Sequence, residues 1–347
     1  MIVADYPNPS MLMVDVRPPI SLQSINHADA PKSAILVTTK NRPDRLMSTL
    51  PRLAGSSLGV VVIDDSSTSR AAASTNRICR KVGVTYHGRK EQELALKPVP
   101  PHLLDGLIAP LGASGWTLGM CRNYSLLLSR ILGFERIILI DDDISIPNDD
   151  FPARTVSLLK GFDFAGARTV GLPDDSVVGH IARRHGVVQY DFVTGQYLGV
   201  RTRVQPAFFP NEYNEDLIFL MLAAGKGKVA RYGTVRQLKR GSSRYSLEKA
   251  TSQERGEIHS EGCMRAVISG QTESLTDTSY WENILNIRMQ GLQDLLARER
   301  EWGGEHLDTL KGVVQVSKRF LPKDFSSFYR VYFDAVPRWV NLQEIIS

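Results

Sequence analysis

Residues 136–143 read Arg-Ile-Ile-Leu-Ile-Asp-Asp-Asp, an apolar run that ends in three aspartates. An uninterrupted branched apolar run is typical of a strand buried on both faces of a parallel sheet. Ligands of such sheets bind outside the carboxyl ends of the strands. In extended backbone, Asp141 and Asp143 project to one side and Asp142 to the other. The stretch therefore predicts a central strand with a group of carboxylates at its tip.

Three neighbouring carboxylates repel one another unless a cation neutralises them. Carboxylate oxygens suit Mg²⁺ or Mn²⁺, and a divalent ion can bridge two phosphate oxygens. The structural alternative is an acidic turn or a helix cap, because aspartate is common in both. We favour a metal site with Asp141 and Asp143 as ligands, because the three acids follow a buried strand directly.

Alternating strands and helices around this stretch predict a doubly wound α/β sheet. We expect strands at residues 33–39, 59–63 and 84–86, a helix that begins near residue 43, and further helices at residues 71–82, 119–132, 217–224 and 280–301. Residues 97–115 are rich in Pro, Gly and Leu, and we expect them to form a loop or lid.

Composition excludes several classes of protein. The 347 residues carry 42 Lys and Arg against 37 Asp and Glu, and the net charge of +5 fits an anionic ligand but does not demand nucleic acid. The sequence has no apolar run of the ~20 residues that span a bilayer, and its start lacks the pattern of a signal peptide. Three distant cysteines form no CxxC pair, which argues against a zinc ribbon or a disulfide scaffold. We expect a cytoplasmic enzyme with no membrane span and no nucleic-acid partner.

Four motifs, in their order along the chain, resemble the GT-A glycosyltransferases, especially those similar to family 2. They are Thr38–Arg42, Ile63–Ser67, Gly119–Asn123 and the DXD-like Asp141-Asp142-Asp143. The resemblance covers roughly residues 33 to 225. It implies the GT-A (nucleotide-diphospho-sugar transferase) fold, which is a Rossmann-like mixed sheet flanked by helices, here with a helical C-terminal extension.

The resemblance also implies a division of the chain. Residues 1–31 would be an irregular N-terminal lead-in and residues 32–245 the catalytic domain. Within that domain, the nucleotide-binding half would end near residue 145 and the acceptor half would follow. Residues 246–347 would form a mainly helical C-terminal region.

Several residues are implied to bind the sugar-nucleotide donor. They are Thr38, Lys40, Arg42, Asp64, Asp65, Arg122, Asn123, Asp141 and Asp142. A carboxylate can accept hydrogen bonds from the N–H edge of a base, and we favour Asp65 over Asp64 for this role. An arginine at a helix N-terminus can grip a phosphate. The alternatives are solvated loop cations, a turn-forming Asp-Asp-Ser-Ser and an ordinary arginine on a helix. Gly119–Asn123 is also one residue shorter than the family pattern Gly-x-x-x-Arg-Asn.

The acids before the apolar helix at residues 217–224 are the candidates for catalysis. In the resembling family, one carboxylate of such a Glu-Asp pair deprotonates the acceptor hydroxyl. We predict Asp216 as this base and Glu215 as the second candidate or an orienting group; the alternative is an ordinary acidic helix start. Thr194 and Gln196 are candidates for acceptor contacts. His259 is a candidate third metal ligand, because some GT-A enzymes supply a histidine from the C-terminal region; a structural histidine is the alternative.

The implied function is a metal-dependent, hexosyltransferase-like glycosyltransferase. It would move a sugar from a nucleoside diphosphate sugar to a hydroxyl or amine acceptor, with Mn²⁺ or Mg²⁺ as cofactor and with inversion at the anomeric carbon, although retention stays open. The acceptor would be a small molecule, a polysaccharide or a secondary metabolite.

Two other functions stay open. A sugar-nucleotide nucleotidyltransferase would carry a Gly-x-Gly-x-x-Arg loop after its first strand, where this chain has Thr-Thr-Lys-Asn-Arg-Pro-Asp. A non-catalytic protein that binds nucleotide sugars is the other alternative.

Overall fold

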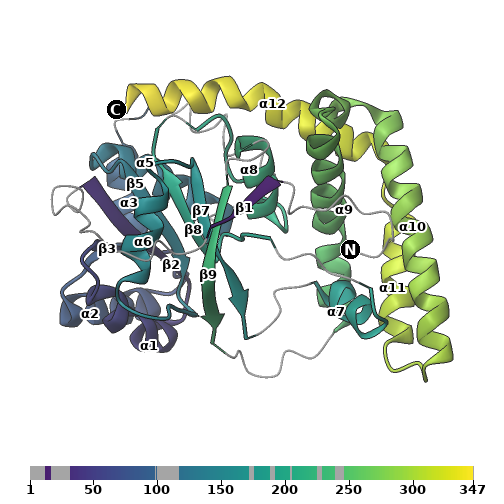
Figure 1. Ribbon diagram of the computed structural model, residues 1–347, viewed down its shortest axis with the longest axis horizontal. Coiled ribbons are helices and arrows are strands. Elements are labelled where there is room, and N and C mark those ends of the chain that lie inside the picture. Colours follow the sequence, from purple (N-terminus) through teal and green to yellow (C-terminus); the bar gives the residue numbers. More distant parts are fainter. Residues whose placement is uncertain are drawn as a thin grey trace.

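The computed structural model describes residues 12–16, 32–97, 99, 117–171, 176–187, 192–203, 205–224, 229–238 and 246–346. A central sheet is flanked by helices, and a group of long helices lies beside it (Figure 1). The loop or lid expected at residues 97–115 lies outside the described residues, apart from residues 97 and 99.

One nine-stranded sheet forms the centre of the molecule. Its strands are β1 (Met13–Asp15), β2 (Ser33–Thr39), β3 (Gly59–Asp64), β4 (Thr85–His87), β5 (Arg136–Asp141), β6 (Ile144–Ser145), β7 (Phe164–Val170), β8 (Tyr197–Arg201) and β9 (Val229–Gln237). The order is β1-β9-β7-β8-β5-β2-β3-β4, and β6 pairs with β9. Strand β8 runs antiparallel to both of its neighbours, whereas β2, β3, β4 and β5 are parallel. The expected mixed α/β sheet is confirmed.

The order in which successive strands are added to the sheet reverses between β2 and β5. Strands β3 and β4 follow β2 on one side, whereas β5 lies on its other side. The two strands run parallel in a register that places Thr38 opposite Asp141. Their carboxyl ends therefore meet at a topological switch point, where ligands of open α/β sheets bind.

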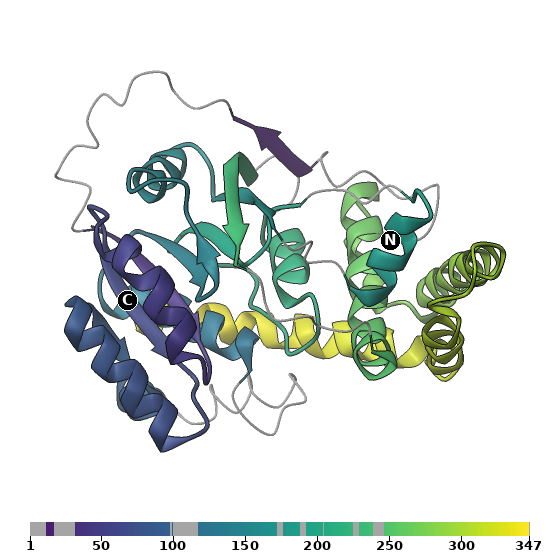
Figure 2. The ribbon, with the colours of Figure 1, turned by 90° about the horizontal axis from the view of Figure 1, so that it is seen from below.

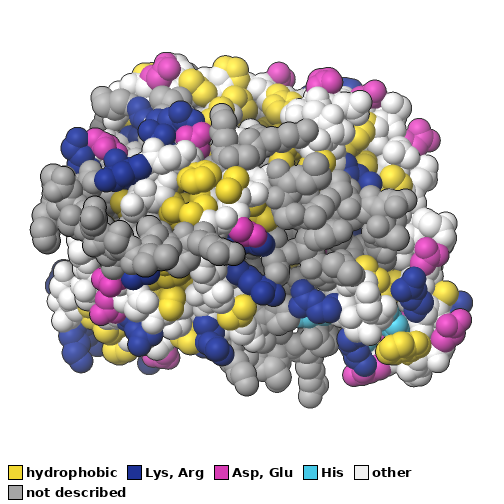
Figure 3. Space-filling view, viewed as in Figure 1, with side chains coloured by type: hydrophobic (Ala, Val, Ile, Leu, Met, Phe, Trp, Pro, Cys, Tyr) yellow, Lys and Arg dark blue, Asp and Glu magenta, His cyan; other side chains and the backbone are white. Residues whose placement is uncertain are grey.

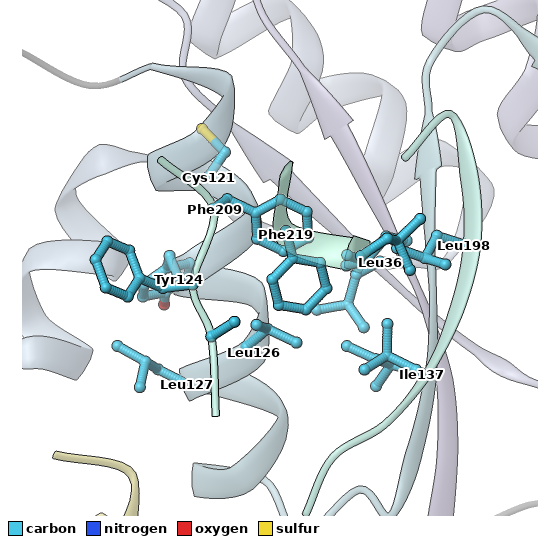
Figure 4. Close-up of a cluster of buried hydrophobic side chains, with 14 of the residues drawn as sticks. Leu36, Cys121, Tyr124, Leu126, Leu127, Ile137, Leu198, Phe209 and Phe219 are labelled. Carbon is cyan, nitrogen blue, oxygen red and sulfur yellow. The ribbon is translucent and has the colours of Figure 1, made fainter. Parts of the chain in front are cut away.

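Alternate residues of the central strands pack against helices on opposite faces of the sheet. On one face, Leu36 and Ile137 pack with residues of α5 (Leu118–Ile131) and α8 (Glu215–Ala224), as Figure 4 shows. On the other face, Ile35 and Ile138 pack with α1 (Pro43–Ala54). The remaining helices of this part are α2 (Ser69–Val82), α3 (Arg89–Leu96), α6 (Phe151–Leu158) and α7 (Val177–Arg184). Because both faces are covered, β2 and β5 are apolar almost to their ends.

The C-terminal region is helical, as expected. It comprises α9 (Leu247–Ser269), a 3₁₀ turn at Thr272–Thr276, α10 (Thr278–Glu301), α11 (Leu307–Ser317) and α12 (Pro322–Ile345). Helix α12 runs from these helices back over the sheet domain (Figures 1 and 2). Its Tyr329 belongs to the apolar cluster of the C-terminal helices, and its Trp339 belongs to the core beneath α5. One helix thus joins the two parts.

The prediction of an irregular lead-in at residues 1–31 was wrong for three residues. Met13–Asp15 form β1, which pairs in parallel with the start of β9. Asp15 and Arg231 also form an ion pair at 2.6 Å. A strand of three residues is too short to show an alternation of apolar and polar residues, and its partner strand β9 lies far along the chain.

In Figure 3, the Lys and Arg side chains are scattered over the face shown and do not form one basic patch. None of the helices in the described ranges combines the length and the apolarity that crossing a bilayer requires.

Candidate active site

The ends of β2 and β5 join two threonines to two of the aspartates. Thr38 Oγ1 donates to Asp141 Oδ1 at 3.0 Å, and Thr39 Oγ1 donates to Asp142 Oδ2 at 2.6 Å. The strand alternation puts Thr38 and Asp141 on the face of α5, and Thr39 and Asp142 on the face of α1. The neighbouring residues Asp141 and Asp142 therefore face different helices, α5 and α1.

On the face of α1, Arg42 bridges two aspartates. Its Nη2 lies 3.0 Å from Asp142 Oδ1, and its Nη1 lies 3.3 Å from Asp143 Oδ2. Thr49 of α1 donates to the backbone carbonyl of Asp142 at 3.0 Å and so fixes the helix to this turn. Burial raises the pKa of Asp142 to about 6, although Arg42 and Thr39 favour its ionised form.

On the face of α5, Arg122 lies between two carboxylates. Its Nη2 is 3.3 Å from Asp141 Oδ1, and its Nη1 is 2.6 Å from Glu215 Oε1. Gly195 makes room for the guanidinium, because a Cβ at that position would lie 2.5 Å from Arg122 Cζ. The carboxylates outweigh the cost of burial and raise the pKa of Arg122, so this side chain stays charged. Burial raises the pKa of Asp141, and Arg122 opposes that rise.

The two acids at the start of α8 differ in their surroundings. Burial raises the pKa of Glu215 to about 8, with Arg122 acting against the rise and Asp216 adding to it. Asp216 accepts two backbone N–H bonds, from Gly195 to Oδ2 at 2.6 Å and from Leu217 to Oδ1 at 2.8 Å. Asp216 thus holds the Gly195 segment against α8. Glu215 instead forms an ion pair with Arg122.

These groups form one cluster with an excess of negative charge. We call it the strand-end cluster: Asp141, Asp142, Asp143, Glu215 and Asp216, together with Arg42 and Arg122. Asp143 and Asp216 both raise the pKa of Asp141, so the acids act on one another. Within the described residues, the five carboxylates meet two guanidiniums, which leaves three negative charges in excess when every acid is ionised. A proton on Glu215 removes one of them near neutral pH.

The donor set suits a hard divalent ion. In the part of the chain that the structure describes, no three His, Cys, Asp or Glu side chains are arranged as a metal centre. Mg²⁺ keeps several waters and needs one or two carboxylates plus substrate phosphates. Asp141 and Asp143 fit this requirement, because among the described residues they belong to a cluster in which carboxylates outnumber guanidiniums.

The structure places the predicted third ligand, His259, in different surroundings. The ring lies in α9 among four aromatic rings, whose centroids are 4.3 to 5.8 Å from its own. They belong to Trp281, Phe325, Phe328 and Tyr329. Its Nε2 lies 3.9 Å from Glu212, and burial lowers its pKa well below the usual value. These contacts join His259 to the core of the C-terminal helices and not to the aspartates of β5.

The predicted nucleotide-binding acids at the end of β3 have separate roles. Asp64 accepts from the backbone N–H and the hydroxyl of Ser66 at 2.9 and 2.6 Å, and from Tyr86 at 3.0 Å. Its carboxylate therefore closes a turn. Asp65 pairs with Lys40 at 2.7 Å and with Arg89 at 2.8 Å. Lys40 and Asp65 come together, as expected of neighbouring strand ends.

Asn123 is engaged by the backbone. Its amide nitrogen donates to the carbonyl of Phe209 at 2.8 Å, and its amide oxygen accepts from the N–H of Phe209 at 2.8 Å. Both ends of the amide are thus used to hold the segment that precedes α8. These contacts favour a structural role over the predicted donor contact.

Sequence reasoning missed three contributors to the site. The alternation along β2 was a signal for Thr39, since it places that hydroxyl beside Asp142. Arg89 gave no local signal, because its partner lies elsewhere in the chain. Gly195 lies in the glycine-containing stretch expected to flank the acceptor, but nothing local indicated that it makes room for Arg122. The acceptor candidates Thr194 and Gln196 flank Gly195, and their Oγ1 and Oε1 atoms are buried without a hydrogen-bond partner. The backbone carbonyl of Gln196 accepts a hydrogen bond from the backbone N–H of Asp141 at 3.1 Å, so this segment lies against the aspartates.

The sheet order and the aspartates at the switch point define a protein with the GT-A fold. Among solved structures, glucosyl-3-phosphoglycerate synthase from Mycobacterium tuberculosis in complex with phosphoglyceric acid is similar, with a TM-score of 0.50 and 16% identity over 74% of this chain and 88% of that chain. A structure of that synthase with Mn²⁺, uridine diphosphate and phosphoglyceric acid gives a TM-score of 0.48 and 15% identity over 72% of this chain and 85% of that chain. No model of a known protein family and no curated protein matches this chain. The likeness confirms the expected fold.

Proposed function

We propose that this protein is a metal-dependent glycosyltransferase that moves a sugar from a nucleoside diphosphate sugar to a hydroxyl or amine acceptor. One observation carries the proposal: three aspartates at the tip of β5 lie at the switch point of the sheet, in a cluster with an excess of negative charge. A synthase of a glucosylated product shares the fold, which is compatible with this activity.

Asp141 and Asp143 would hold Mn²⁺ or Mg²⁺. When bound, the ion supplies Lewis-acid stabilisation of charge on the departing diphosphate. Thr38 and Arg122 hold Asp141 in place. Asp142 is turned toward α1 and held by Thr39, so we assign it a positioning role.

Asp216 is the better candidate for the base that accepts the proton of the acceptor. Glu215 is held by Arg122, whose Nη1 lies 2.6 Å from its Oε1 and so occupies one of its carboxylate oxygens. Asp216 accepts two backbone N–H bonds, which orient its carboxylate and leave lone pairs for a hydroxyl. A base on this side of the cluster supports single displacement with inversion. The anomeric configuration of the product tests it.

Asp65, Lys40 and Arg89 form the side of the site at the end of β3, where we place the nucleotide. The buried, unpartnered Oγ1 of Thr194 and Oε1 of Gln196 favour contacts to the acceptor. We propose a small molecule as this acceptor; the similar synthase was solved with phosphoglyceric acid.

The test combines nucleotide binding and product analysis. The purified protein is incubated with UDP, GDP and ADP sugars and Mn²⁺, and free sugar and nucleoside diphosphate are measured. Asp143→Asn is expected to abolish turnover and Mn²⁺-dependent binding of nucleoside diphosphates. Asp150→Asn is the matched control, because Asp150 is an exposed aspartate that follows the same strand.

Three outcomes would contradict the proposal. Full activity of Asp143→Asn in a chelator would remove the metal role. Release of pyrophosphate from a nucleoside triphosphate and a sugar phosphate would indicate a nucleotidyltransferase. If donors bind but no free sugar or product appears, the protein is a binding module.

A further inference from the structure

The carboxylates at the tip of β5 differ in their access to solvent. The side chains of Asp142 and Asp143 are 0% exposed, whereas that of Asp141 is 12% exposed. Arg42, which pairs with both buried carboxylates, is 38% exposed. The guanidinium therefore lies on the solvent side of Asp142 and Asp143. A cation that reaches Asp143 from that side meets Arg42 first.

The main chain at Arg42 is fixed independently of its side chain. The carbonyl of Arg42 accepts from the N–H groups of Arg45 and Leu46 at 3.1 and 3.2 Å, so the residue caps α1. Asn41 has a φ of 55°, a left-handed conformation that asparagine tolerates better than most residues. Three hydrogen bonds of 2.8 to 3.0 Å join Asn41 to Ser66 and Ser67. The contacts of Asn41 and the capping carbonyl of Arg42 therefore hold the main chain without help from the guanidinium.

The ion pairs of Arg42 with the two aspartates can be replaced by an ion pair with another anion. The guanidinium of Arg42 is 38% exposed and so is only partly desolvated, unlike the two carboxylates that it meets. A carboxylate that pairs with a guanidinium must release it before the same oxygen coordinates a cation. A diphosphate offers the released guanidinium a new anionic partner with matching geometry. In the exchange, Asp143 gains the metal and Arg42 gains the phosphate, while Asp142 keeps the hydrogen bond from Thr39.

We propose that Arg42 is a displaceable counter-ion of Asp143 that makes metal binding depend on the diphosphate. Without a divalent ion, Arg42 pairs with both Asp142 and Asp143. When the metal and the diphosphate bind together, the metal takes Asp143 and Arg42 pairs with a phosphate oxygen. The inference rests on the proposed function and adds an order to it: the metal alone binds weakly, and the diphosphate strengthens its binding.

The experiment measures Mn²⁺ binding and not turnover. The electron paramagnetic resonance signal of free Mn²⁺ is titrated with the full chain, alone and with UDP or GDP. In Arg42→Gln, we expect Mn²⁺ alone to bind about tenfold more tightly and the enhancement by the nucleotide to fall by a similar factor, within the usual range of coupling between two ligands. Arg42→Lys keeps the charge and is expected to lie between the two proteins.

Arg45→Gln is the matched control. It removes the same charge one turn along α1, and its side chain makes no ion pair or hydrogen bond to the aspartates among the described residues. We expect its Mn²⁺ affinity to stay within twofold of the wild type. Thermal unfolding verifies that each variant is folded.

The outcomes separate the inference from the proposed function. If the wild type binds Mn²⁺ and a nucleotide together but Arg42→Gln binds Mn²⁺ with equal or lower affinity, Arg42 is not a competitor and the inference is overturned. If the wild type binds neither UDP nor GDP in the presence of Mn²⁺, the proposed function is overturned as well.

Discussion

Two clusters of arginines and carboxylates lie in different parts of this molecule. One is the strand-end cluster. The other, which we call the helix cluster, comprises Glu254, Glu261, Arg265 and Arg288 of α9 and α10. Arg288 forms two hydrogen bonds to Glu254, at 2.9 and 2.7 Å, and lies 3.6 Å from Glu261. Arg265 pairs with Glu261 at 3.3 Å.

The two clusters differ in their balance of charge. The helix cluster has two carboxylates and two guanidiniums, and Ser317 donates a further hydrogen bond to Glu254 at 3.1 Å. The strand-end cluster has five carboxylates for two guanidiniums. A cluster whose charges balance needs no further cation, and its role is structural. An unbalanced one can take up protons or a cation; burial, and to a lesser extent the neighbouring acids, raises the pKa of Asp142 and of Glu215.

The largest expected effect is on catalysis. Asp216→Asn is expected to lower kcat by about 10²–10⁴, the usual contribution of a general base, because an amide cannot accept the proton. Its oxygen can still accept one backbone N–H, so the unfolding temperature is expected to change little. Steady-state kinetics and circular dichroism measure the two effects. A kcat within fivefold of the wild type would show that another group is the base.

The helix cluster is tested through stability. Arg288→Met leaves Glu254 buried without the counter-ion that binds both of its oxygens, and is expected to lower the free energy of unfolding by about 3–5 kcal/mol. Lys311→Met is the control, because it breaks the exposed pair with Asp308 and is expected to cost at most about 1 kcal/mol. Urea denaturation measures both variants. Equal losses would mean that burial does not distinguish the two pairs.

The smallest expected effect is a pH dependence of stability at the strand ends. The pKa of Glu215 is raised from 4.5 to about 8, so folding favours its protonated form. Its contribution to stability is complete below pH 4.5 and is lost as the pH rises through 8, by at most about 1.4 kcal/mol per pH unit. The contribution of Asp142 to stability also falls as the pH rises, but this contribution is lost as the pH passes through about 6.

Glu215→Gln isolates this effect. The amide oxygen can still accept from Arg122, but the side chain does not titrate. We expect the free energy of unfolding, measured in urea between pH 6 and 8, to fall less steeply in the variant than in the wild type. Parallel curves for the two proteins would refute the raised pKa.

The sequence predicted the fold because the fold depends on local patterns. The apolar run of β5 and the strands and helices around it imply a parallel sheet, and the aspartates at its tip imply a site at its edge. Strand alternation alone placed Asp142 opposite its neighbours. Strand β1 escaped prediction, because three residues carry no period and the partner strand β9 lies far away.

The roles within the site were less accessible to sequence reasoning. Asp64 and Asp65 are adjacent and chemically identical, yet one closes a turn with Ser66 and Tyr86 and the other pairs with Lys40 and Arg89. His259 matched a family expectation, but its aromatic neighbours come from α10 and α12. Such differences depend on residues that are distant in the chain.

By itself, the sequence determined the sheet, the strand that ends in three aspartates and the helical C-terminal region, because hydrophobic period and strand alternation act between near neighbours. Only the tertiary structure decided which cation meets which carboxylate. Arg42 reaches Asp143 and Arg122 reaches Glu215 because separate loops and helices converge at the switch point, and the charge balance of the site exists only once they have done so.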